Sequence, residues 1–77
     1  MSADGALRDD VLAALREHGC TVSLLSGSGV PAHTYRVGFK SQILAQTMPD
    51  VISRKVLSNF VRRFGISIAA FFPVENR

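Results

Sequence analysis

The spacing of hydrophobic residues changes along the chain, and the first stretch has the spacing of a helix. One predicted helix face carries Leu7, Val11, Leu12 and Leu15. Residues three and four positions apart share a helix face, so this stripe predicts a helix that ends before residue 20. Asp4 is a suitable N-cap for this helix, and Gly19 stands where a left-handed residue would end it.

After this helix, apolar residues alternate with polar ones, which is the spacing of half-buried strands. A first strand carries on one face Cys20, Val22 and Leu24. The sequence SGSGVP at 26–31 then predicts a loop, because it combines glycine, serine and proline. A second strand is predicted from about His33 to Lys40. Its two faces carry, respectively, Tyr35, Val37 and Phe39, and Thr34, Arg36 and Lys40.

A third strand is predicted from Gln42 to about Met48, after a turn at residues 40–41. Pro49 ends it, because proline has no N–H to donate to a ladder. Residues 43–45 also fit a helix, and this alternative stays open at the level of the sequence.

The strongest periodic signal lies near the end of the chain and predicts a helix from about Ser53 to Phe64. Its apolar stripe consists of Val56, Leu57, Phe60, Val61 and Phe64. Asp50 or Ser53 is suited to cap its start, and Gly65 to end it. The apolar residues at 66–74 are predicted to pack back, as a short helical turn or as a contact surface.

Together these elements predict an α+β fold. In this two-layer α-β-β-β-α sandwich, both helices cover one face of a three-stranded antiparallel sheet. With 77 residues, of which 47% are hydrophobic and 19% charged, the chain is predicted to form a single domain over residues 1–77, with a core at about 5–72. A core of this size is only marginally stabilising, and a homodimer would add buried surface, although nothing in the sequence requires one.

Composition excludes several classes of protein. The one cysteine, Cys20, allows no internal disulfide and no cysteine-based zinc site, and it is predicted to be a buried apolar residue. Residues 1–10 lack a basic segment followed by an apolar run, so no secretory signal is expected, and no apolar run approaches the roughly 20 residues that span a bilayer. We therefore expect a cytoplasmic protein with no membrane contact, no metal and no cofactor.

Charge is distributed unevenly along the chain. Residues 1–30 hold two Arg against four Asp or Glu, a balance of −2, whereas residues 31–77 hold seven Lys or Arg against two acids, a balance of +5. This asymmetry indicates an anionic partner such as RNA, and the alternative is an ordinary solvated surface. The candidate phosphate-binding residues are Arg36, Lys40, Arg54, Lys55, Arg62 and Arg63.

Three segments resemble the HicA toxin family, which uses the fold of double-stranded RNA-binding domains. They are DVLAALREHGCTVSLLSGSG (10–29), HTYRV (33–37) and SRKVLSNFVRRFGISIAAFF (53–72). Members of the family are small ribonucleases that act on messenger RNA and are neutralised by a partner antitoxin. The resemblance therefore implies an RNA-binding toxin-like protein whose partners are double-stranded or messenger RNA and an antitoxin.

The family's catalytic residue is a histidine in a Gly-Ser-His motif at the start of the second strand, and His33 is the matching candidate here. Residues 30–32, Val-Pro-Ala, separate His33 from the Gly-Ser pairs of the preceding loop. An alignment on Tyr35 and Arg36 puts Ala32 at the catalytic place instead. As a catalyst, His33 would act as general base on a ribose hydroxyl, with Arg36 stabilising phosphate charge.

Strand parity supports a different prediction for the same residue. It places His33 on the face of Tyr35, Val37 and Phe39, where a partly buried, hydrogen-bonded histidine is expected. Two alternative functions then remain open. One is a catalytically inactive relative that binds a protein, for example a phage or mobile-element inhibitor of a host complex. The other is an unrelated α+β interaction module.

Overall fold

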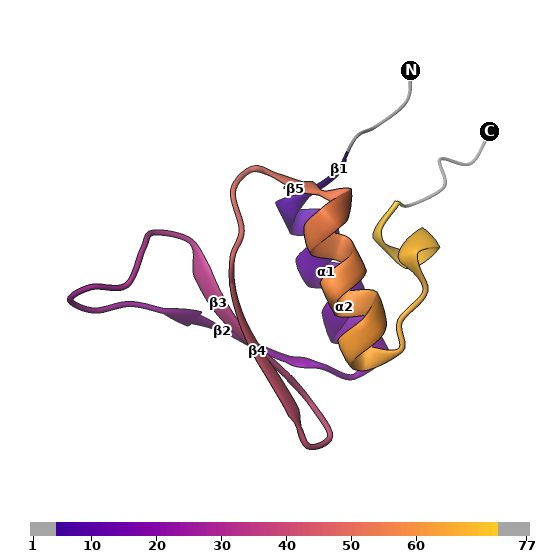
Figure 1. Cartoon of the computed structure of the whole chain (residues 1–77), viewed down its shortest axis with the longest axis horizontal. Helices are drawn as coiled ribbons and strands as arrows, with labels where there is room; N and C mark the ends of the chain where they lie inside the picture. Colours follow the sequence, from indigo (N-terminus) through magenta and orange to yellow (C-terminus); the bar gives the residue numbers. More distant parts are fainter. Residues whose placement is uncertain (1–4, 73–77) are drawn as a thin grey trace.

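Two helices pack against one face of a three-stranded antiparallel sheet, as the hydrophobic pattern predicted (Figure 1). The structure is a computed structural model that describes residues 5–72. The elements in chain order are β1 (Gly5–Leu7), α1 (Arg8–His18), β2 (Thr21–Leu25), β3 (Thr34–Phe39), β4 (Gln42–Thr47), β5 (Val51–Ser53), α2 (Arg54–Phe64) and the 3-10 helix η1 (Ile68–Phe71).

The sheet is a meander in the order β2-β3-β4, so β4 is a strand and the helical alternative for residues 43–45 is wrong. Val37 lies at its centre, opposite Val22 on β2 and Leu44 on β4. Because side chains alternate between the faces of a strand, this register puts the odd-numbered residues of β3 against the helices. Val37 is fully buried there, and Tyr35 and Phe39 pack on the same core.

The two helices share that core and end in the same way. Both end at a left-handed glycine, Gly19 after α1 and Gly65 after α2, as predicted. At this end, Nε2 of His18 donates to the carbonyl oxygen of Phe64 at 3.2 Å, and the His18 ring lies 4.7 Å from that of Phe39. His18 therefore holds the ends of both helices against the sheet.

A second, two-stranded sheet of β1 and β5 was not predicted. It pairs Gly5 with Ser53 and Leu7 with Val51, and so joins the starts of the two helices. A β-carbon at Gly5 would overlap the carbonyl oxygen of Ile52, so this pairing needs glycine. Leu7 precedes α1 as its N-cap and is 59% exposed, so its predicted place on the buried stripe is wrong. Asp4, the predicted cap, lies outside the described residues.

The helices cover only part of the sheet. In Figure 1 the loop between β2 and β3 extends away from both helices. Leu24, at that end of β2, is 61% exposed although strand alternation predicted a half-buried side chain. No helix within residues 5–72 is both long and apolar enough to cross a membrane.

Candidate nucleic-acid interface

The basic face of α2 is presented by a well-anchored helix. The Ser53 side chain accepts a hydrogen bond from the Val56 N–H at 3.3 Å and caps the first turn, as predicted. Leu57, Phe60 and Phe64 are buried along one side of the helix. Their positions leave the opposite side to solvent, because a helix turns about 100° per residue.

The four cationic residues of α2 are all exposed: Arg54, Lys55, Arg62 and Arg63. Within residues 5–72, none of them forms an ion pair, since the one salt bridge found there joins Arg8 and Asp50. Arg54 is held by an aromatic contact, with its guanidinium carbon 4.7 Å from the centre of the Phe72 ring. Within the described chain, the ammonium and guanidinium groups of this helix therefore have no anionic partner.

A groove runs between α2 and β4 beside these cations. It has a volume of about 310 Å³ and is lined by Leu44, Asn59, Arg62 and Arg63. Arg62 donates to Oδ1 of Asn59 at 3.2 Å, which orients its guanidinium along the helix. Sequence reasoning missed Asn59 and Leu44, although the spacing of Asn59 and Arg62 at i and i+3 is a signal for adjacent side chains.

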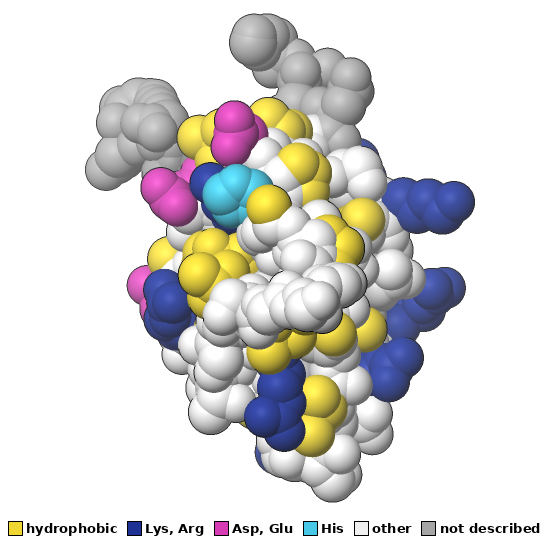
Figure 2. Space-filling view, turned by 90° about the vertical axis from the view of Figure 1, so that its left-hand side faces the viewer, with side chains coloured by type: hydrophobic (Ala, Val, Ile, Leu, Met, Phe, Trp, Pro, Cys, Tyr) yellow, Lys and Arg dark blue, Asp and Glu magenta, His cyan; other side chains and the backbone are white. Residues whose placement is uncertain are grey.

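Most acidic side chains of the described chain belong to α1. In Figure 2 the Asp and Glu side chains gather at the upper left, with Lys or Arg beside them, while several other Lys and Arg side chains project along the right edge. The sequences of the two helices account for this separation. α1 carries Asp9, Asp10 and Glu17, whereas α2 has no acidic residue. The uneven charge of the sequence is therefore a spatial asymmetry as well.

Arg36 and Lys40 do not join the basic face of α2. Arg36 points to the face of the sheet opposite the helices, because its neighbour Val37 points into the core. Lys40 lies in the β3–β4 turn with a left-handed φ of 55°, and its ammonium is 5.2 Å from the centre of the Phe39 ring. The six predicted phosphate-binding residues thus lie on more than one surface.

His33 lies in the loop before β3, and its predicted burial is wrong. Its φ is 60°, so the alternation of β3 does not extend back to it, and its side chain is exposed. Its carbonyl oxygen accepts from the Met48 N–H at 2.7 Å, which fixes the backbone. Among the described residues, no hydrogen bond or ion pair involves the His33 ring.

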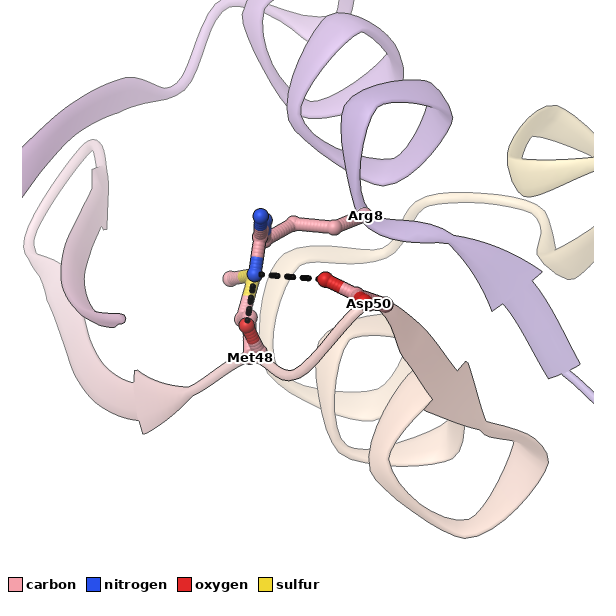
Figure 3. Close-up of polar contacts among 3 residues, drawn as sticks. All are labelled: Arg8, Met48 and Asp50. Atoms are coloured by element: carbon pink, nitrogen blue, oxygen red, sulfur yellow. Dashed lines mark hydrogen bonds and ion pairs between the residues drawn. The ribbon is translucent and has the colours of Figure 1, made fainter. Parts of the chain in front are cut away.

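Arg8 was not singled out from the sequence, yet it makes several polar contacts in the structure (Figure 3). Its guanidinium donates to the carbonyl oxygen of Met48 at 3.1 Å and lies 3.4 Å from Oδ1 of Asp50. The Arg8 N–H also donates to the Asp50 carbonyl at 2.9 Å. These contacts fasten the start of α1 to the β4–β5 connection, so Arg8 stabilises the fold and is not free to bind an anion.

Cys20 and the possible metal ligands are the remaining chemistry-bearing groups of the described chain. Cys20 is buried, and burial raises the pKa of its thiol, so the nucleophilic thiolate is disfavoured at neutral pH. Within residues 5–72, no three His, Cys, Asp or Glu side chains lie close enough together to hold a metal ion.

Comparisons with protein-family models, with curated proteins and with solved structures found no match to this chain. The resemblance to the HicA family therefore stays a prediction.

Proposed function

We propose that this protein is a cytoplasmic RNA-binding protein that holds the phosphate backbone with the basic face of α2. The single observation that supports this proposal is the set of four exposed cations on α2, which form no ion pair within the described chain. The predicted resemblance to the HicA family points to the same ligand. An antitoxin-like protein partner belongs to that resemblance and is proposed with it.

Double-stranded RNA suits such a surface. Duplex RNA is recognised mainly by its shape and through its phosphates and 2′-hydroxyls, and this recognition does not require base-reading side chains. Lys55 and Arg62 lie two helical turns apart and could each meet a phosphate, while the Asn59 amide between them could bond a 2′-hydroxyl. One RNA strand can lie in the groove beside β4, next to Arg63.

Binding through phosphates has a defined signature in salt. The affinity for labelled double-stranded RNA should fall steeply between about 50 and 200 mM salt, because each neutralised phosphate releases counterions. Arg62→Glu with Arg63→Glu should reduce both the affinity and the salt slope, since the slope falls by about one for each lost contact. Binding is measured by fluorescence anisotropy.

Arg16→Glu is the matched control for the single variant Arg62→Glu. Arg16 is exposed in the last turn of α1, as Arg62 and Arg63 are in the last turn of α2, so reversal costs each helix a similar dipole interaction. The control should bind RNA nearly as the unchanged protein does. Equal losses in both proteins, or no binding of the unchanged protein at low salt, would remove the proposal.

The proposal is for binding without cleavage by His33. General acid–base cleavage needs a second group beside the histidine to stabilise phosphate charge, and no such partner of the His33 ring is found in the described chain. We expect RNA to stay intact in the presence of the protein, and His33→Ala to change neither RNA affinity nor thermal unfolding. RNA cleavage that disappears in His33→Ala would contradict this.

A second candidate function is binding to a protein. It is favoured by the edge strands β2 and β4, which contain no charged residue and carry the exposed side chains of Leu24 and Ile43. Uncharged edges are open to pairing with another chain. In the salt titration this function predicts no RNA binding, and in host lysate it predicts a stoichiometric complex that survives nuclease treatment.

A further inference from the structure

The face of the sheet that points away from the helices contains a polar hollow of about 240 Å³. Its walls come from all three strands and from the turns at their ends: Gly19, Thr21, Ser23, Arg36, Gly38, Lys40 and Ile43. The proposed RNA-binding face belongs to α2, so this hollow is a separate feature of the molecule.

The strand register explains why the sheet is hollow at this place. Gly38 lies at the centre of the sheet, directly between Thr21 on β2 and Ile43 on β4. These three positions share one face, and the middle one has no side chain. A β-carbon at Gly38 would lie 3.0 Å from Oγ1 of Thr21 and 3.9 Å from Cγ1 of Ile43, so even alanine would narrow the space.

The groups around this space are cationic or neutral, and none is acidic. Arg36 stands two residues before Gly38 on the same face, in register with Ser23 on β2. Within residues 5–72 the Arg36 side chain forms no ion pair and no hydrogen bond, and the Ser23 hydroxyl likewise has no hydrogen-bond partner. The Thr21 hydroxyl donates weakly, at 3.3 Å, to the Gly38 carbonyl.

Lys40 adds a second positive charge at the end of the hollow. Its ammonium lies over the Phe39 ring, at 5.2 Å from the ring centre. A cation–π contact at an exposed site is weak, so a doubly charged anion in the hollow can draw the flexible lysine across. The arginine fork and the lysine point charge then complement each other, as they do in phosphate recognition generally.

We propose that this hollow binds a phosphate group that carries two negative charges, such as a terminal phosphate. Arg36 and a hydroxyl on this face, with Lys40 at the end of the hollow, match a dianion, whereas the bridging phosphate of a nucleic-acid backbone carries one charge. This inference does not rest on the proposed function of α2, because the two sites lie on different elements and share no residue.

Titration with inorganic phosphate at constant ionic strength, followed by two-dimensional ¹H–¹⁵N NMR, tests the site. The largest shifts should occur at the amides of Thr21, Ser23, Gly38 and Ile43. Arg36→Gln should weaken phosphate binding roughly tenfold, because it removes a charge-assisted, bidentate contact. Gly38→Ala should weaken it as well by narrowing the hollow, whereas Arg16→Gln, a matched loss of an exposed arginine, should leave it unchanged.

Two outcomes would overturn the proposal: equal phosphate affinity in the Arg36→Gln and unchanged proteins, or shifts that concentrate on residues 54–63. Both outcomes can be measured whether or not α2 binds RNA. Short RNAs with a 5′-phosphate or a 5′-hydroxyl then identify the source of the group. Tighter binding of the phosphorylated RNA, lost in Arg36→Gln, assigns the site to a nucleic-acid end, and equal binding assigns it to small phosphate compounds.

Discussion

The two helices of this protein are built alike and charged differently. Each has 11 residues, each ends at a left-handed glycine, and each buries an apolar stripe in the common core. In α1 the charges suit the helix itself, with Asp9 and Asp10 in the first turn and Arg16 and His18 in the last. Acids at the start and bases at the end stabilise a helix through its dipole.

In α2 the first turn contradicts that rule. It has no acidic residue, and its first two residues are Arg54 and Lys55, which lie at the positive end of the dipole. Stability of the helix therefore does not account for these two charges. The difference between the helices teaches that the charges of α1 suit its own dipole, whereas Arg54 and Lys55 of α2 do not, and the proposed binding of RNA would account for them.

The largest expected effect tests whether the two helices share the core equally. Phe60 and Leu15 are both fully buried, and Phe60 also packs on the rings of Phe64 and Phe71 at 6.1 and 6.0 Å. Phe60→Ala should cost about 3–5 kcal/mol and Leu15→Ala about 2–5 kcal/mol of unfolding free energy. Such losses are a large part of the stability of a small domain.

Urea denaturation followed by circular dichroism measures both losses, provided that the slope of the transition stays constant. An exposed alanine substitution, Ser41→Ala, serves as the control and should change the unfolding free energy little. If either core variant lost less than about 1 kcal/mol, that helix would not be held by its buried stripe.

A smaller effect is expected at the start of each helix. Ser53→Ala removes the side-chain cap of α2 and should cost about 1 kcal/mol. Leu7→Ala is the counterpart in α1, whose N-cap makes no side-chain hydrogen bond, and it should cost less. Thermal unfolding compares the two variants. A loss in Leu7→Ala as large as that in Ser53→Ala would mean that capping does not distinguish the helices.

The smallest effect on stability is also the sharpest test of the comparison. Lys55→Glu places an acid in the first turn of α2 and should stabilise the protein by about 0.3–1 kcal/mol, while it weakens the binding of RNA. Asp9→Lys makes the opposite change in α1 and should destabilise the protein without a loss of RNA affinity. Calorimetry and anisotropy on both variants separate the two readouts. A Lys55→Glu protein that is less stable, or that binds RNA equally well, would break the comparison.

Most of the fold could be predicted because the longer elements carry clear periods. The stripe of α2, its Ser53 cap and the glycine ends of both helices are confirmed, as are three strands of alternating pattern. β1 and β5 were missed because three residues are too few to show a period. Their pairing joins segments that lie far apart in the sequence, which no local pattern records.

The candidate site was harder to predict because its residues were grouped by sequence and not by face. Alternation already put Arg36 opposite Val37, and therefore away from the helices, yet Arg36 was grouped with the cations of α2. The predicted burial of His33 was wrong for a local reason. Its left-handed backbone interrupts the strand. Side-chain alternation extended through such a residue therefore assigns its side chain to the wrong face.

The pairing of β1 with β5 has a consequence for the order of folding. The β2–β3–β4 meander needs only neighbouring segments to meet, whereas residues 5–7 must find residues 51–53 after most of the chain has been closed into a loop. Closing a long loop costs entropy before any contact repays it, so this ribbon is expected to form after the transition state. Ile52→Val, in β5, should then accelerate unfolding and leave the folding rate nearly unchanged.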